Sequence, residues 1–160
     1  MGRGHDGTHA RMIVGRPDPR AGDAPVGHHD TVTVPVGPGD HRTPEQWLRS
    51  AFEDAPGLLR AAITVGWRFG LLLRLTRGRS PGAVLGWPIV ASDAAAVRVE
   101  AASVLMTARL VLRLTAGTAV MTTDVRFTRW PARPVWALAL PVHRRLVPYL
   151  LGRAARRRPS

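Results

Sequence analysis

The sequence contains no cysteine and no lysine. Without cysteine, the 160-residue chain can form no disulfide, no thiolate metal site and no cysteine nucleophile. The 23 basic residues are therefore all arginine, and with 11 acidic residues they give a formal net charge of +12. Arginine without lysine, together with abundant alanine, glycine, proline and valine, is typical of GC-rich codon usage. The positive charge alone is thus weak support for a nucleic-acid partner.

Signals for catalysis, export and membrane insertion are also missing. No glycine-rich phosphate loop follows a predicted strand, and no serine lies in a nucleophile-elbow context. The first 28 residues contain no apolar stretch typical of a signal peptide, which predicts a cytoplasmic protein. Residues 58–76 are long and apolar, but Arg60, Arg68 and Arg74 would each cost about 2.5 to 3.5 kcal/mol at a bilayer centre. We therefore expect that this segment does not span a membrane.

Length and composition predict one domain preceded by a polar extension. A chain with 45% hydrophobic residues can bury a core of ordinary size. Residues 1–28 are polar and glycine-rich with little periodicity, which predicts a disordered extension before a single domain at 29–158. We expect loop histidines here and neither a metal nor another cofactor, because no fixed spacing on a rigid element is visible. Five of the six histidines lie in or near this region: His5, His9, His28, His29 and His41.

Residues 30–76 predict a strand and two helices. Residues 30–36 alternate valine with polar residues, as in a short edge strand. Thr43, Pro44 and Gln46 have the spacing of a helix start with a capping box, and this helix is predicted to end near Asp54. A second helix follows from Leu58. Its expected inner stripe comprises Leu58, Ala62, Val65, Phe69, Leu72 and Leu73.

The opposite face of the second helix combines arginines with apolar side chains. Two interpretations remain open. An exposed Trp67 between arginines resembles an anchor for an anionic membrane surface. Alternatively, the N-terminal segment or another loop covers Trp67. The residues of this arginine face are Arg60, Trp67, Arg68, Leu71 and Arg74.

From Ala83 onward the period changes to two, which predicts an antiparallel meander. We expect strands at 84–91, 95–101, 104–114 and 118–129. A turn at Ala116 and Gly117 places Leu112 opposite Met121 and Ala108 opposite Val125 on an apolar face. A slip of one residue would place charged side chains on that face, at a cost of several kcal/mol.

The end of the chain predicts a long helix. At 100° per residue, an apolar stripe falls on one side of this helix, and Arg144 and Arg145 fall on the far side. Pro141 and Pro148 lie on the arginine side, so either a kinked helix or two short helices is possible. The stripe comprises Val135, Leu138, Val142, Leu146 and Tyr149.

Three stretches resemble a family of small uncharacterised bacterial proteins with the helix-grip fold, within the SRPBCC or START-like superfamily. They are residues 84–90 (VLGWPIV), 105–113 (LMTARLVLR) and 136–151 (WALALPVHRRLVPYLL). The resemblance covers residues 30–157. It implies an α+β helix-grip fold, in which an antiparallel meander wraps around a long C-terminal helix and two short helices follow the first strand. It also implies a cavity between sheet and helix, which in the superfamily holds lipids, polyketides or aromatic compounds. No catalytic motif of a characterised member is matched.

Such a cavity suggests a hydrophobic small molecule as the leading partner. His143 falls on the apolar flank of the terminal helix, where it could act as an acid or base in a cyclase or hydratase reaction, or hold the polar end of a ligand. The alternative is a histidine that hydrogen-bonds to the backbone at the edge of the core. The expected lining residues are Met106, Leu110, Met121, Thr123, Phe127, His143 and Tyr149.

Two surface partners are further alternatives. The arginine face could bind an anionic membrane. The arginines from Arg153 to Arg158 could neutralise phosphates, but the polar face of the sheet carries no aromatic stacking platform, so we disfavour nucleic acid.

Overall fold

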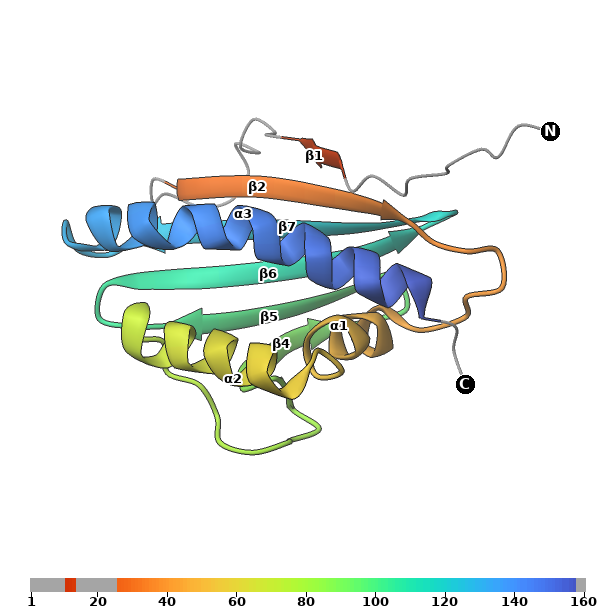
Figure 1. Ribbon diagram of the computed structural model, residues 1–160, viewed down its shortest axis with the longest axis horizontal. Coiled ribbons are helices and arrows are strands. Elements are labelled where there is room, and N and C mark those ends of the chain that lie inside the picture. Colours follow the sequence, from red (N-terminus) through yellow and green to blue (C-terminus); the bar gives the residue numbers. More distant parts are fainter. Residues whose placement is uncertain (1–10, 14–25, 158–160) are drawn as a thin grey trace.

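Strands with alternating apolar residues form one antiparallel sheet. The computed structural model describes residues 11–13 and 26–157 (Figure 1). Among these residues, seven strands lie in the order β1-β2-β7-β6-β5-β4-β3. The strands are β1 (Arg11–Ile13), β2 (Val26–Pro35), β3 (Ala83–Val84), β4 (Trp87–Ser92), β5 (Ala96–Ala102), β6 (Met106–Thr115) and β7 (Thr118–Phe127).

The register between β6 and β7 is the one predicted from burial. Leu112 pairs with Met121 and Ala108 with Val125, and these four side chains are buried. The two-residue turn between the strands includes Gly117, whose φ of 82° is readily adopted by glycine. The apolar face of the meander is therefore confirmed.

The first long strand extends further than predicted. β2 begins at Val26 instead of residue 30, so the sheet reaches into the segment for which disorder was predicted. The rest of that segment, residues 1–10 and 14–25, lies outside the described residues. The register of β2 against β7 shifts between Val26 and His28. At this bulge Gly27 lies against the ring of Phe127, which leaves no room for an added Cβ.

Four helical segments follow the predicted order. They are α1 (Pro44–Phe52), α2 (Gly57–Val65), the π-helical turn η1 (Gly66–Gly70) and α3 (Ala132–Arg156). The predicted start of α1 is confirmed, because Thr43 and Gln46 form a reciprocal capping box. The inner face of α1 buries Trp47 and Leu48 against the core, as expected.

The terminal helix is a single helix that lies across one face of the sheet (Figure 1). It continues through Pro141 and Pro148, so the interpretation as two short helices is wrong. The predicted sheet-facing stripe is also wrong. Leu138 and Val142 are 81% and 63% exposed, and Tyr149 is exposed as well. The face that packs on the core lies one residue, or about 100°, further around the helix. It carries Trp136, Val147, Leu150, Leu151 and Ala154.

The second helix is turned the other way from the prediction. Leu73, beyond the end of η1, is buried as expected, whereas Leu58 and Phe69 are 90% and 69% exposed. Trp67 instead turns inward, where its ring lies 5.2 Å from that of Trp87, and Leu71 is buried. Both sides of the α2–η1 segment are apolar, so periodicity could not identify the buried side. The contact between the indole rings of Trp67 and Trp87 identifies it. The five residues of the predicted arginine face therefore do not share one surface.

These elements form an α+β helix-grip fold, as predicted. A strand, two helices and an antiparallel meander precede a long helix that packs against the sheet. No helix among the described residues is long and apolar enough to cross a membrane.

Candidate functional site

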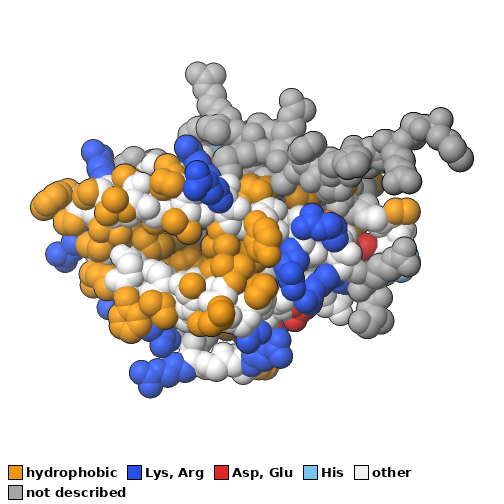
Figure 2. Space-filling model, viewed as in Figure 1, with side chains coloured by type: hydrophobic (Ala, Val, Ile, Leu, Met, Phe, Trp, Pro, Cys, Tyr) orange, Lys and Arg blue, Asp and Glu red, His pale blue; other side chains and the backbone are white. Residues whose placement is uncertain are grey.

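A cavity of about 500 Å³ lies between the sheet, the α2–η1 segment and α3. Figure 2 shows it as a hollow with hydrophobic side chains around it. The sheet supplies the floor, and the two helical segments supply opposite walls. The principal lining residues are Ile63, Trp67, Trp87, Ala108, Leu110, Thr123, Val125, Val135, Trp136, Leu138, Val142, His143 and Leu146.

Three of the seven predicted lining residues face this cavity: Leu110, Thr123 and His143. The floor consists of two neighbouring cross-strand pairs, Leu110 with Thr123 and Ala108 with Val125. The next pairs on the same face, Met106 with Phe127 and Leu112 with Met121, do not line the cavity.

The other four predicted residues lie elsewhere. Met106 and Met121 are fully buried in the core, and Phe127 packs against it from a half-buried position. Tyr149 is exposed. The prediction placed the lining along β6 and β7 from Met106 to Phe127, whereas Met106 and Met121 are covered by packed side chains.

The aromatic walls were not predicted. Trp67, Trp87 and Trp136 all line the cavity. Trp67 had been placed on the arginine face, and its correct side is visible only once the tertiary contacts are known. The stripe of α3 that was expected to pack on the sheet has a different role, since Val135, Leu138, Val142 and Leu146 line the cavity instead.

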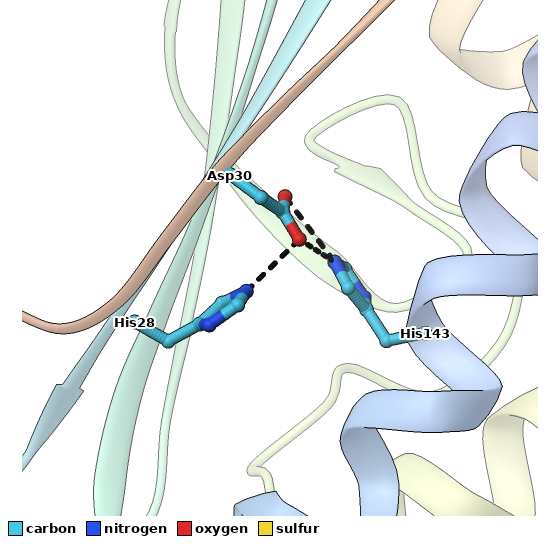
Figure 3. A group of neighbouring side chains, drawn as sticks. All are labelled: His28, Asp30 and His143. Carbon is cyan, nitrogen blue, oxygen red and sulfur yellow. Dashed lines mark hydrogen bonds and ion pairs between the residues drawn. The ribbon is translucent and has the colours of Figure 1, made fainter. Parts of the chain in front are cut away.

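A cluster of two histidines and one aspartate joins the sheet to α3 beside the cavity (Figure 3). The carboxylate Oδ2 of Asp30 lies 2.9 Å from Nε2 of His28 and 3.2 Å from Nε2 of His143. Asp30 is only 2% exposed, and both histidines are largely buried. The ring of Trp136 lies 5.2 Å from that of His28 and 5.3 Å from that of His143.

The environment of Asp30 favours its ionised form. Burial alone raises the pKa of this carboxyl, but the hydrogen bonds from His143 and His28 outweigh burial and hold the pKa well below its ordinary range. A buried carboxylate is stable here because two imidazole N–H groups donate to it.

Strand and helix periodicity explain how these three side chains meet. Residues 28 and 30 point to the same face of β2, because side chains alternate along a strand. His143 lies on the buried side of α3, seven residues after Trp136. A signal for Asp30 was present in the sequence, since it is in phase with the buried Val32 and Val34. The catalytic role of His143 stays a prediction.

The interpretation of His28 and His29 as loop histidines is wrong, because both belong to β2. The neighbouring His29 points to the other face of the sheet, where Nδ1 contacts the carboxylate of Asp124. His41 is exposed, and His5 and His9 lie outside the described residues.

Three polar atoms in cavity-lining residues have no hydrogen-bond partner among the described residues. They are Oγ1 of Thr123 and the indole Nε1 atoms of Trp87 and Trp136. Thr123 is the cross-strand partner of Asp30 in the β2–β7 pair, so the two side chains are neighbours on the same face. Unpaired buried polar groups are uncommon and costly in folded proteins.

The arginines of the predicted arginine face contact the backbone. Arg60 donates to the carbonyl oxygen of Glu53 at 2.6 Å, and Arg68 donates to that of Leu75 at 3.3 Å. Both line a second hollow of about 410 Å³. Arg74 is exposed. Arg68 thus contacts the loop that connects η1 to β3, whereas Arg60 contacts the C-terminal end of α1.

No protein-family model matches the sequence, and no curated protein matches it either. One similar solved structure is the di-domain ARO/CYC BexL from the BE-7585A biosynthetic pathway, with 18% sequence identity and a TM-score of 0.40. The match covers 82% of this chain and 51% of that one, so it spans about half the length of the di-domain protein.

Proposed function

We propose that this protein binds a hydrophobic small molecule in the cavity between the sheet, α2–η1 and α3. The observation that carries the proposal is the cavity itself, whose volume of about 500 Å³ lies in the range of small-molecule sites. Its surface is mostly apolar, with His143 and Thr123 as the polar exceptions. The narrower relationship to the small helix-grip family is part of this proposal.

The mouth of the cavity supports the same function. Leu138 and Val142 line the cavity and are at the same time exposed to solvent. Large apolar side chains grouped at an opening lose their contact with water when a ligand enters, and this removal of apolar surface favours binding by about 25 cal/mol per Å². The indole rings of Trp67, Trp87 and Trp136 supply flat apolar surface for an aromatic or polycyclic ligand.

Titration with an environment-sensitive apolar dye tests the proposal. We expect saturable binding to the native protein with a blue-shifted emission. Leu110→Trp should abolish it, because the added indole occupies the floor of the cavity. Val111→Trp is the matched control, since Val111 is the next residue of β6 and points to the opposite face. Absence of saturable dye uptake, or equal uptake by the two variants, would contradict the proposal.

A second candidate function is peripheral membrane binding, favoured by the outer face of α2 and η1. Leu58, Val65 and Phe69 are exposed there on a protein of net charge +12. Apolar side chains on a positively charged protein suit the interface of an anionic bilayer. The predicted anchor Trp67 is not among them, because it lines the cavity.

Sedimentation with anionic phospholipid vesicles tests this candidate. We expect salt-sensitive binding that Phe69→Glu reduces strongly, while Trp67→Phe leaves it unchanged. Binding that is the same for Phe69→Glu and the parent protein would exclude the outer face of α2 and η1 as the contact.

A further inference from the structure

We propose that His28, Asp30 and His143 form a binding site for a divalent transition-metal ion of the Zn²⁺ type. Two imidazoles and one carboxylate from β2 and α3 point toward one another at the edge of the cavity (Figure 3). The proposal goes beyond the proposed function and does not depend on it.

The separations between the ligand atoms suit one ion. Ligand atoms bound to a tetrahedral Zn²⁺ at 2.0 to 2.1 Å lie about 3.3 Å from one another. Oδ2 of Asp30 lies 2.9 Å from Nε2 of His28 and 3.2 Å from Nε2 of His143. The ligand atoms all lie within 4.8 Å of one another. An approach of the two imidazoles by at most about 1.5 Å, from 4.8 Å to about 3.3 Å, would therefore complete the ligand geometry.

The donor set determines the class of ion. Imidazole nitrogen suits zinc, copper, iron, cobalt and nickel, whereas magnesium and calcium are bound mainly by oxygen. Two imidazoles and one carboxylate leave at least one coordination position for water or another ligand. His143 also lines the cavity, so the cluster adjoins the space in which a small molecule would lie.

The cluster is held in place by rigid elements. His28 and Asp30 belong to the ten-residue strand β2, and His143 lies in the 25-residue helix α3. Trp136 packs against both imidazole rings. A second observation is Oγ1 of Thr123, which is buried without a hydrogen-bond partner on the cross-strand neighbour of Asp30. A water molecule bound to a metal ion would supply such a partner.

The alternative is a purely structural contact in which both histidines donate to Asp30. The two interpretations differ in one respect. A structural cluster has no stoichiometric affinity for zinc, whereas a metal site binds one ion per chain and depends on all three side chains.

Competition between the purified protein and a chromogenic zinc chelator tests the proposal. We expect one Zn²⁺ per chain and no displacement by millimolar Mg²⁺. His28→Gln, Asp30→Asn and His143→Gln should each weaken binding at least about tenfold, because each removes one of the three ligands. His29→Gln is the matched control, since His29 also contacts an aspartate but on the other face of β2. It should bind Zn²⁺ like the parent.

A second readout remains valid if one variant folds poorly. Co²⁺ in place of Zn²⁺ should give visible absorption bands of a protein-bound ion, and these should be absent in His28→Gln. Absence of stoichiometric Zn²⁺ binding in the parent protein would overturn the proposal, as would equal loss in His29→Gln. Leu110→Trp, which blocks the cavity floor, should retain the metal, so failure of this site and failure of hydrophobic ligand binding are distinguishable.

Discussion

Oδ2 of Asp30 on β2 lies 3.2 Å from Nε2 of His143 on α3, although the two residues are 113 positions apart in the sequence. This contact joins the first long strand to the last helix beside the cavity. It also explains why a histidine on the apolar side of α3 is tolerated, since its Nε2–H has a buried carboxylate as its acceptor.

We predict that His143→Ala lowers the free energy of unfolding by about 2 kcal/mol when a chelator is present. The substitution removes one of the two donors to a carboxylate that is 2% exposed. Urea denaturation measures the change. His29→Ala removes a contact between half-exposed groups and should cost less than about 1 kcal/mol. A loss in His143→Ala as small as that in His29→Ala would show that the buried cluster is not a stabilising contact.

At the mouth of the cavity, we predict that Val142→Arg weakens binding of an apolar dye by about tenfold. It removes a valine contact of about 1.5 kcal/mol and places a charge at the opening. Stability should hardly change, because Val142 is exposed. The control is Ala137→Arg, which adds the same charge on α3 at an exposed position outside the cavity lining. If both variants bind the dye equally, the mouth does not lie between α2 and α3.

The acid stability of the protein should depend on Asp40. The hydrogen bond from Arg42 lowers the pKa of Asp40 from 3.8 to about 2. A carboxyl with a lowered pKa stabilises the folded state above pH 3.8, and this contribution is lost as the pH falls toward 2.

The same lowered pKa predicts that Asp40→Asn reduces the free energy of unfolding by about 2 kcal/mol at neutral pH. The difference from the parent should shrink as the pH falls from 4 to 2, which urea denaturation at a series of pH values measures. A difference that stays constant over this range would contradict the assignment.

The capping box of α1 gives a smaller effect. Oγ1 of Thr43 accepts from the backbone N–H of Gln46 at 3.2 Å, and Oε1 of Gln46 accepts from the backbone N–H of Thr43 at 2.9 Å. Thr43→Ala should cost about 1 kcal/mol of stability, and Thr43→Ser should restore most of it. Thermal unfolding followed by circular dichroism compares the three proteins. A serine variant as unstable as the alanine variant would exclude the cap as the cause.

The sheet could be predicted from the sequence because its alternation has only one acceptable register. A shift by one residue would bury Asp124 and Arg126 among apolar side chains, and no other contact could offset that cost. The start of α1 could be predicted as well, because its capping box involves only the four residues from Thr43 to Gln46.

The orientation of the helices and the composition of the site could not be predicted in the same way. α2 and α3 each carry apolar residues on two sides, one for the core and one for the cavity or the solvent. Periodicity finds both sides and cannot rank them. The contact between Asp30 and His143 depends on how α3 crosses β2, and nothing local encodes that. Only the phase of Asp30 with Val32 and Val34 indicated that a charged side chain faces the core.

The most direct test of ligand binding in the cavity is an NMR experiment on methyl-labelled protein with one equivalent of 8-anilinonaphthalene-1-sulfonate. We predict intermolecular contacts from the probe to the methyl groups of Ile63, Leu110 and Val125, which line the cavity. Methyl groups of the closed core, such as those of Val32, should show none. Contacts restricted to exposed residues such as Leu58, or no contacts at all, would contradict the claim that this protein holds a hydrophobic small molecule.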